Sequence, residues 1–275
     1  GEDMIPKIIH YCWFGKKELP SEYKKYIDSW KKNCPDYQIK KWNEDNFDIN
    51  SSTYMREAYE ENKWAFVSDY ARLKIIYDEG GIYLDTDVEL IKPLDDLLEE
   101  KCFLATETTG YINTGLGFGA EKGNEIIKEM LDEYSGLHFK GGNGVYDNIA
   151  CPKRNTAPFT KYGFEFSLDK RIRIKNALIL PPEYFCPIDY MTGETIITNK
   201  TYSIHHYSAT WLSNEDLIIN EKIDEIVRKS GFLSGQIKKQ WFLYNVQKKA
   251  GKTNSFIKFL ASKIKLKLRI SRWKV

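Results

Sequence analysis

Four of the charged residues in the largely apolar stretch 64–90 form two closely spaced pairs. Asp69 and Arg72 lie in its first half, and Asp85 and Asp87 lie in its second half. Charges in apolar surroundings are costly unless they are paired, hydrogen-bonded or bound to a metal. The stretch therefore encodes either a structural ion-pair network or a functional site.

The Asp-x-Asp triplet is suited to binding a hard cation. On a strand, residues two apart point to the same face, so Asp85 and Asp87 could present their carboxylates together. Parallel α/β sheets place ligands at the carboxyl ends of their strands, where such oxygens suit Mg²⁺ or Mn²⁺. A metal there could neutralise charge on a phosphate leaving group. Alone the triplet is weak, because it occurs by chance about once in a chain this long, and an exposed strand end would explain it equally well.

The neighbouring Asp–Arg pair strengthens the functional interpretation. Asp69 and Arg72 are three residues apart and share one face of a predicted helix, which continues through Gly80-Gly81 directly into the strand that carries Asp85. A salt bridge on a helix surface would explain a lone pair. It does not explain a pair within "AFVSDYARLKIIY", where most of the other residues are apolar. We therefore expect a buried pair that receives a polar, hydroxyl-rich ligand.

The elements that must position these residues alternate between strand and helix. Apolar periodicity and turn residues predict the following order: strand 5–14, helix 19–32, strand 37–42, helices 53–62 and 63–78, strand 82–90, strands 102–107 and 115–120, helix 125–134, a long loop 136–162, and a closing strand 197–211. This alternation predicts an α/β domain with a mostly parallel sheet. We expect a catalytic domain over residues 4–212 and a basic helical region over 213–275.

Three motifs together resemble a known family. "IPKIIHYCWFG" (5–15), "SDYARLKIIYDEGGIYLDTDVEL" (68–90) and "YSIHHYSATW" (202–211) resemble the DXD-motif sugar transferases of glycosyltransferase family 32. They are also similar to the glucosylating domains of the large clostridial toxins. The resemblance implies a GT-A fold, a nucleotide-sugar donor, a divalent metal that is usually Mn²⁺, with Mg²⁺ as the alternative, and retention of anomeric configuration.

The resemblance also implies roles for donor-binding residues. Trp13 matches the aromatic residue that stacks on the nucleotide base, although a tryptophan at a strand end can simply be buried in the core. Asp69 and Arg72 match the pair that holds the donor sugar. Tyr83 matches a residue beside the ribose and phosphate, and Asp85 matches the aspartate nearer the ribose and sugar.

The metal ligands are expected from two motifs. Asp87 matches the direct metal ligand of the family, which often takes its last ligand from the C-terminal motif. His205 and His206 are adjacent, so on a strand only one can enter the site, and imidazole suits Mn²⁺ or Zn²⁺ better than Mg²⁺. We expect His206, which shares a face with Ser208, and keep His205 as the alternative. Ser208 and Trp211 are expected over the diphosphate.

The resemblance, together with the charge pattern, implies a retaining, metal-dependent hexosyltransferase that moves a sugar from a UDP-sugar to a glycan acceptor, in bacterial surface or capsular polysaccharide synthesis. Asn113 falls where the family places a polar residue near the sugar. No second carboxylate is clearly placed as a nucleophile, so we expect front-face attack in which the leaving phosphate helps to deprotonate the acceptor hydroxyl. Acceptor contacts are expected from the loop 136–162, because loops carry specificity.

Two alternatives of other classes remain. Phosphatases of the haloacid-dehalogenase type carry an apolar strand followed by Asp-x-Asp-x-Thr/Val, which begins like "IYLDTDV" but requires Thr or Val where Glu89 stands. A non-catalytic sugar-binding protein would keep the fold without the reaction. The presence of both charged pairs argues against it.

The charge distribution predicts a further partner. Of the 41 basic residues, 14 lie after Glu225, where the chain has no acid. Residues 232–275 also carry aromatic side chains, which suits an anionic membrane surface and a lipid-linked acceptor. No recognition motif for nucleic acid accompanies them, and a helix packed on the acidic domain is the ordinary alternative. Five scattered cysteines without a CxxC pair indicate a reducing compartment. We therefore expect a cytoplasmic protein bound peripherally to the inner face of the membrane.

Overall fold

The computed structural model describes residues 5–142, 144–147, 149–188 and 194–207. Ser208, Trp211, the basic segment 232–275 and the predicted domain boundary at residue 212 lie outside the described residues. Within the described ranges, no helix combines the length and apolar character that a membrane crossing requires.

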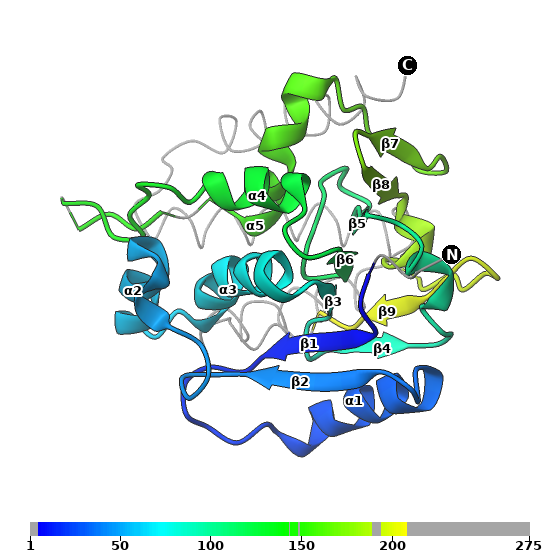
Figure 1. Cartoon of the computed structure of the whole chain (residues 1–275), viewed down its shortest axis with the longest axis horizontal. Helices are drawn as coiled ribbons and strands as arrows, with labels where there is room; N and C mark the ends of the chain where they lie inside the picture. Colours follow the sequence, from blue (N-terminus) through cyan, green and yellow to red (C-terminus); the bar gives the residue numbers. More distant parts are fainter. Residues whose placement is uncertain (1–4, 143, 148, 189–193, 208–275) are drawn as a thin grey trace, which may run out of the picture. The chain divides into compact units, whose positions relative to one another are not determined.

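Seven strands form the central sheet in the order β2-β1-β3-β6-β5-β8-β7 (Figure 1). Their bounds are β1 (Ile8–Cys12), β2 (Gln38–Trp42), β3 (Gly81–Tyr83), β5 (Cys102–Ala105), β6 (Phe118–Ala120), β7 (Ile172–Ile174) and β8 (Ala177–Leu180). The β1–β2, β1–β3 and β5–β8 pairs are parallel, whereas β6 and β7 are antiparallel to their neighbours. Five of the seven strands thus run in one direction. The predicted α/β class with a mostly parallel sheet is confirmed, and it is consistent with a GT-A fold.

The helices lie close to their predicted positions. They are α1 (Ser21–Asn33), α2 (Thr53–Glu60), α3 (Trp64–Glu79), α4 (Glu125–Asp132) and α5 (Cys151–Thr156), with short 3₁₀ turns η1 (Ile49–Ser51), η2 (Asp95–Leu97), η3 (Ala157–Tyr162) and η4 (Pro182–Tyr184). The apolar stripe of α1 buries Tyr23, Tyr26, Ile27 and Trp30, as its sequence spacing requires. The loop predicted over 136–162 contains α5 and η3, which its prolines and polar residues concealed.

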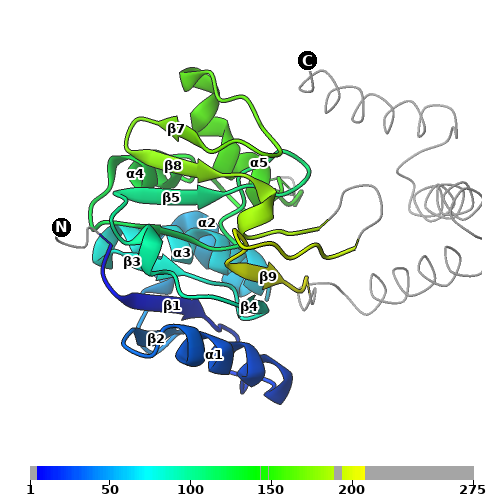
Figure 2. The ribbon, with the colours of Figure 1, turned by 90° about the vertical axis from the view of Figure 1, so that its right-hand side faces the viewer.

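The sheet is buried on both faces, which side-chain alternation along its strands makes possible. On β5, Cys102 and Leu104 join a core with α2, α3 and α4, whereas Phe103 and Ala105 join a second core on the opposite face with α1. Figures 1 and 2 show α3 and α4 along one face of the sheet. The site-bearing segments therefore rest on a scaffold that is packed from both sides.

The segment 82–90 is not the single strand that its sequence predicts. It divides into β3 in the central sheet and β4 (Val88–Leu90), and β4 pairs with β9 (Ser203–His205) in a separate two-stranded sheet. Asp85 and Asp87 lie in the turn between the two strands, where the Val88 N–H donates to the Asp85 carbonyl at 3.1 Å. The expected mechanism for placing both carboxylates on one strand face is therefore wrong, and a change of sheet places them instead.

Two glycines connect α3 to this turn. Gly80 ends α3 with φ of 70°, and its N–H donates to the Ile76 carbonyl at 2.9 Å. A Cβ on Gly81 would lie 2.8 Å from the Nε2 atom of His10, so only glycine fits there. The buried His10 accepts a hydrogen bond from the Trp42 indole at Nδ1 (3.0 Å) and contacts the Gly80 carbonyl through Nε2 (2.9 Å). This packing fixes the path from the helix to the aspartates.

Candidate active site

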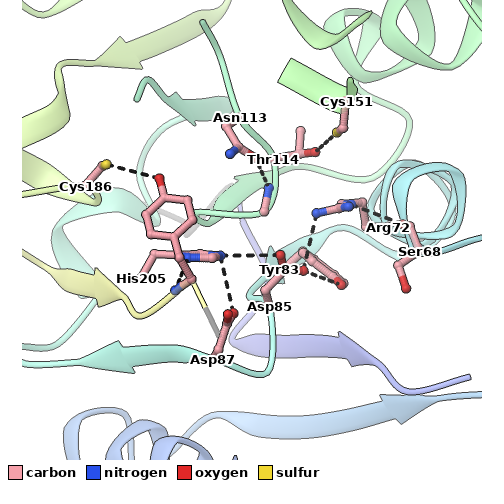
Figure 3. Close-up of polar contacts among 12 residues, drawn as sticks. Ser68, Arg72, Tyr83, Asp85, Asp87, Asn113, Thr114, Cys151, Cys186 and His205 are labelled. Carbon is pink, nitrogen blue, oxygen red and sulfur yellow. Dashed lines mark hydrogen bonds and ion pairs between the residues drawn. The ribbon is translucent and has the colours of Figure 1, made fainter. Parts of the chain in front are cut away.

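Arg72 connects the helix to the turn that carries the aspartates. Its guanidinium is buried and donates from Nε to the Ser68 carbonyl (3.1 Å), from Nη1 to Asp85 Oδ1 (3.3 Å) and from Nη2 to Asp69. It also lies over the Tyr83 ring, 5.4 Å from its centre. Burial raises the pKa of the Asp69 carboxyl, and the charge of Arg72 offsets this only in part. Burial would lower the pKa of Arg72, but the charges of Asp85 and Asp69 raise it well above its usual value. The predicted Asp69–Arg72 pair is thus buried and joined to Asp85. Figure 3 shows the contact between Arg72 and Asp85.

Asp85 is bound from three sides. The Tyr83 hydroxyl donates to its Oδ1 at 3.0 Å, Arg72 donates to the same oxygen, and His205 Nε2 lies 3.6 Å from Oδ2. Burial by itself would raise the pKa of Asp85, but the charge of Arg72 and the contacts from His205 and Tyr83 hold it below its usual range. Asp85 is therefore kept as a carboxylate in a site where an isolated acid would tend to be neutral.

His205 brings the end of the described chain to the aspartates. In the β4–β9 pair it lies opposite Val88, and its Nε2 is 3.3 Å from Asp87 Oδ1 as well as 3.6 Å from Asp85. Burial would lower the pKa of His205, but the two carboxylates raise it above its usual value. The Tyr207 N–H donates to Nδ1 at 3.1 Å, so the proton of a neutral ring lies on Nε2 and faces the carboxylates.

His206 does not face this cluster, although the sequence favoured it over His205. Its Nε2 lies 2.8 Å from Glu89 Oε2, and its ring stacks on Tyr26 with centroids 4.7 Å apart. The two imidazoles point to opposite sides, as alternation along a strand requires. The prediction that His206 faces the metal site is wrong, because the pairing of β9 with β4 directs His205, the alternative, toward Asp87.

Asn113 lies beside the same cluster, on the connection between β5 and β6. Its Oδ1 accepts a hydrogen bond from the Gly115 N–H at 2.7 Å. A Cβ on Gly115 would lie 2.6 Å from Asp85 Oδ2, 3.0 Å from Asn113 Oδ1 and 3.1 Å from Arg72 Nη1. Gly115 was not singled out from the sequence, because its role comes from a close approach between distant segments.

Cys151 is another site neighbour that the sequence did not reveal. At the start of α5 its thiol contacts Asn155 Oδ1 (3.1 Å) and Thr114 Oγ1 (3.5 Å), and it interacts favourably with the Asp69 carboxylate, which lowers the pKa of Asp69 against the larger effect of burial. Burial raises the pKa of this thiol, so it is present as the neutral group. α5 thus forms the wall of the site behind Asp69, a position that a lone cysteine in a loop-like sequence could not indicate.

The remaining donor-binding predictions are not brought into this cluster by described contacts. Trp13 follows β1 at the same edge of the sheet, but its indole N–H donates to the Lys17 carbonyl at 2.9 Å and its ring contacts Tyr23. Ser208 and Trp211 lie outside the described residues. Their predicted roles remain predictions.

The chemistry of the cluster fits a divalent cation. Asp85, Asp87 and His205 each offer one ligand atom, and these atoms lie within 4.8 Å of one another. Two carboxylate oxygens with one imidazole suit Mn²⁺ better than Mg²⁺. For Nε2 of His205 to join the carboxylates as a ligand, the proton of the neutral ring would have to lie on Nδ1. The hydrogen bond from the Tyr207 N–H to Nδ1 would then have to open.

The chain is similar to several glycosyltransferases. Residues 20–104 match the family described as "Glycosyltransferase sugar-binding region containing DXD motif". Inositol phosphoceramide mannosyltransferase 1 of Schizosaccharomyces pombe is 31% identical over 124 residues, which cover 40% of this chain and 37% of that protein. Lactosylceramide 4-alpha-galactosyltransferase of Mus musculus is 27% identical over 165 residues, covering 54% and 43%. The chain therefore spans less than half the length of these relatives.

A solved structure described as PaToxG glycosyltransferase aligns over 57% of this chain and 70% of its own, with 23% identity and a TM-score of 0.46. The matched family segment begins just before α1 and ends in β5, so it contains Asp69, Arg72, Asp85 and Asp87. This match covers less than a third of the chain and includes both charged pairs, so the chain is similar to the DXD-containing sugar-binding regions of glycosyltransferases over that segment.

Proposed function

We propose that the protein is a metal-dependent glycosyltransferase that moves a hexose from a UDP-sugar to a glycan acceptor with retention of configuration. The observation that carries the proposal is the network in which Arg72 joins Asp69 to Asp85, with Asp87 and His205 beside it. A phosphatase needs a free aspartate as nucleophile, whereas Asp85 here is occupied by hydrogen bonds from an arginine and a tyrosine.

Each residue has a task that its environment supports. Asp87 and His205 would hold a divalent cation, which when bound neutralises the charge that develops on the departing diphosphate. Asp69 and Arg72 offer a carboxylate and guanidinium donors to sugar hydroxyls, and they are preorganised because both side chains are buried. Asp85 keeps Arg72 in place and remains ionised.

A panel of UDP- and GDP-sugars, scored for release of the nucleoside diphosphate with Mn²⁺ present, tests the proposal. We expect slow hydrolysis of at least one UDP-hexose by the wild-type protein. Asp87→Asn should lower this rate by about 100-fold, because removing one charge stabiliser from a transition state costs roughly that much. Near-normal turnover of Asp87→Asn at saturating Mn²⁺ would contradict the metal assignment, and preference for a GDP-sugar would contradict the donor assignment.

The acceptor proposal rests on composition and on the names of relatives. The two relatives cited above are named for transfer to lactosylceramide and inositol phosphoceramide, which supports a lipid-linked acceptor here, as in bacterial surface glycans. The basic segment 232–275 supports peripheral attachment to the inner face of the membrane. Deleting 255–275 should abolish co-sedimentation with anionic vesicles at low salt and leave UDP-sugar hydrolysis unchanged. Equal sedimentation of both proteins would refute this attachment.

A further inference from the structure

Glu107 lies at the edge of the sheet that carries the catalytic turn. β5 and β3 run in the same direction, since both are antiparallel to β6, and carboxyl ends of parallel strands meet at one edge. Glu107 follows the end of β5 by two residues, as Asp85 follows the end of β3. Its backbone is fixed, because its N–H donates to the Tyr111 carbonyl (2.9 Å) and its carbonyl accepts from the Gly110 N–H (2.9 Å).

The side chain of Glu107 is tied to the site through two contacts. The side chains of Thr109 and Asn113 interact favourably with its carboxylate and lower its pKa, against the larger effect of burial. The Oδ1 atom of Asn113 accepts a hydrogen bond from the Gly115 N–H, so the amide group of Asn113 can face Glu107 as a donor. Gly115 in turn lies against Asp85. Asn113 and Gly115 thus connect Glu107 to Asp85.

The carboxylate of Glu107 has acceptor positions for a further hydrogen bond. A carboxylate offers about four acceptor positions, of which the two neutral donors occupy only part. The titratable groups near it are His205, Tyr207 and Cys186. The side chain is half-buried, and this burial raises the pKa of its carboxyl, so the carboxylate is a stronger base than that of an exposed glutamate.

We propose that Glu107 is a catalytic residue on the acceptor side of the site, where it accepts a hydrogen bond from the attacking hydroxyl and takes its proton. This inference rests on the proposed transferase function. In the step, the acceptor oxygen bonds to the anomeric carbon, the bond from that carbon to the diphosphate oxygen breaks, and its electron pair leaves with the nucleoside diphosphate. The hydroxyl proton passes to Glu107, which replaces the leaving phosphate in the role that the sequence-based expectation gave it. In hydrolysis a water molecule takes the place of the acceptor.

Two variants and a control test this role without knowledge of the natural acceptor. Glu107→Gln keeps the size of the side chain and one acceptor oxygen but removes the base, and Glu107→Ala removes the side chain. The control is Glu100→Gln, because Glu100 lies at the opposite end of β5 in a surface ion pair with Arg173. The readouts are kcat and the donor KM for hydrolysis of the UDP-hexose that the wild type cleaves, and the Kd of UDP with Mn²⁺ by calorimetry.

We expect Glu107→Gln to lower kcat by about 100-fold or more, as loss of a general base does, with the donor KM and the UDP Kd unchanged. Added formate should restore the activity of Glu107→Ala several-fold, because a small carboxylate can enter the space left by the side chain. It should not restore Glu107→Gln, whose side chain still fills that space. Glu100→Gln should resemble the wild type.

Three results would overturn the proposal: a kcat of Glu107→Gln close to that of the wild type, a parallel loss of kcat and UDP affinity, or no formate rescue of a folded Glu107→Ala. A parallel loss would mean that Glu107 only supports Asn113. If Glu107→Ala does not fold by circular dichroism, the kcat and KM of Glu107→Gln decide alone. Absence of both hydrolysis and UDP binding in the wild type would instead refute the proposed function.

Discussion

Gly115→Ala should disable the site without disturbing the fold. Gly115 has a backbone conformation open to any residue, since its φ is not positive, so the substitution acts only through the added methyl group. That methyl would lie 2.6 Å from Asp85 Oδ2 and 3.1 Å from Arg72 Nη1. Both groups are held by other contacts and cannot simply rotate away.

The distance by which the Asp85 carboxylate must move determines the expected loss of activity. Carbon–oxygen contacts below 3.0 Å are essentially not tolerated, and ordinary contact begins near 3.4 Å, so the Asp85 carboxylate must move by several tenths of an ångström to about 1 Å. A misplacement of about 1 Å at a reacting centre can lower the rate by about 100-fold. We expect a loss of this order in kcat/KM for UDP-hexose hydrolysis. Because the methyl is small and the site is a polar one at the sheet edge, the free energy of unfolding should change by less than about 1 kcal/mol.

The matched control is Gly142→Ala, since nothing lies within 4 Å of a Cβ at Gly142 and its φ is not positive. UDP release from the donor is measured for both variants, and thermal unfolding reports their stability. We expect full activity from Gly142→Ala. Activity of Gly115→Ala within threefold of the wild type would refute the steric argument, and a large loss of stability in Gly115→Ala would assign its effect to the fold instead.

Three further predictions concern stability and the metal. Burial lowers the pKa of His10 from 6.5 to about 4; between these values the unfolded chain binds a proton that the folded chain does not, so stability falls as the pH falls. The difference in unfolding free energy between wild type and His10→Gln, measured by urea denaturation, should therefore shrink by about 3 kcal/mol from pH 7 to pH 4, and an unchanged difference would show that His10 does not titrate abnormally. Asp147→Ala should lower the free energy of unfolding by about 3 kcal/mol, because it leaves the Arg154 side chain, 7% exposed, without its partner at 2.7 Å. The double variant Asp147→Ala/Arg154→Met should recover part of this loss. An unchanged free energy of unfolding for Asp147→Ala would refute the prediction. His205→Ala should weaken Mn²⁺ binding at least tenfold by calorimetry, whereas His206→Ala should not; the reverse order would restore the prediction made from sequence.

The sequence predicted the elements whose patterns are local. The apolar stripe of α1, the alternation of helices and strands up to β3 and the glycine that ends α3 all follow from residues within one or two turns of each other. The β7–β8 hairpin was missed although "RIRIKNALIL" alternates over its first half and is apolar over its second. Its signal is short, and it follows a long segment without regular pattern. The predicted strand 82–90 was too long for a similar reason, because no local residue pattern marks the point where the chain passes from the central sheet to the two-stranded sheet.

Site residues could be predicted from the sequence where charged side chains stand in an apolar segment. They could not be predicted where only the three-dimensional arrangement brings them to the site. A buried Asp69–Arg72 pair could be inferred because polar residues in an apolar helix require partners. Gly115 and Glu107 carry no such signal. A glycine in "NTGLGFG" and a glutamate after a strand are ordinary. The approach of Gly115 to Asp85, and of Glu107 to Asn113, exists only once β6 lies between β3 and β5.

The choice between His205 and His206 shows why pairing partners matter. A shift of one residue in register reverses which side chains of a strand face the site, and β9 contributes only three residues to its pairing with β4. Two hydrogen bonds beyond these residues fix the register: the Ile91 N–H donates to the Tyr202 carbonyl (2.9 Å), and the His206 N–H donates to the Asp87 carbonyl (3.0 Å). The second of these makes the backbone of His206 support Asp87 while its imidazole faces away. Since β4 also continues directly from the catalytic turn, the same short pairing determines both the path of the aspartates and the histidine that reaches them.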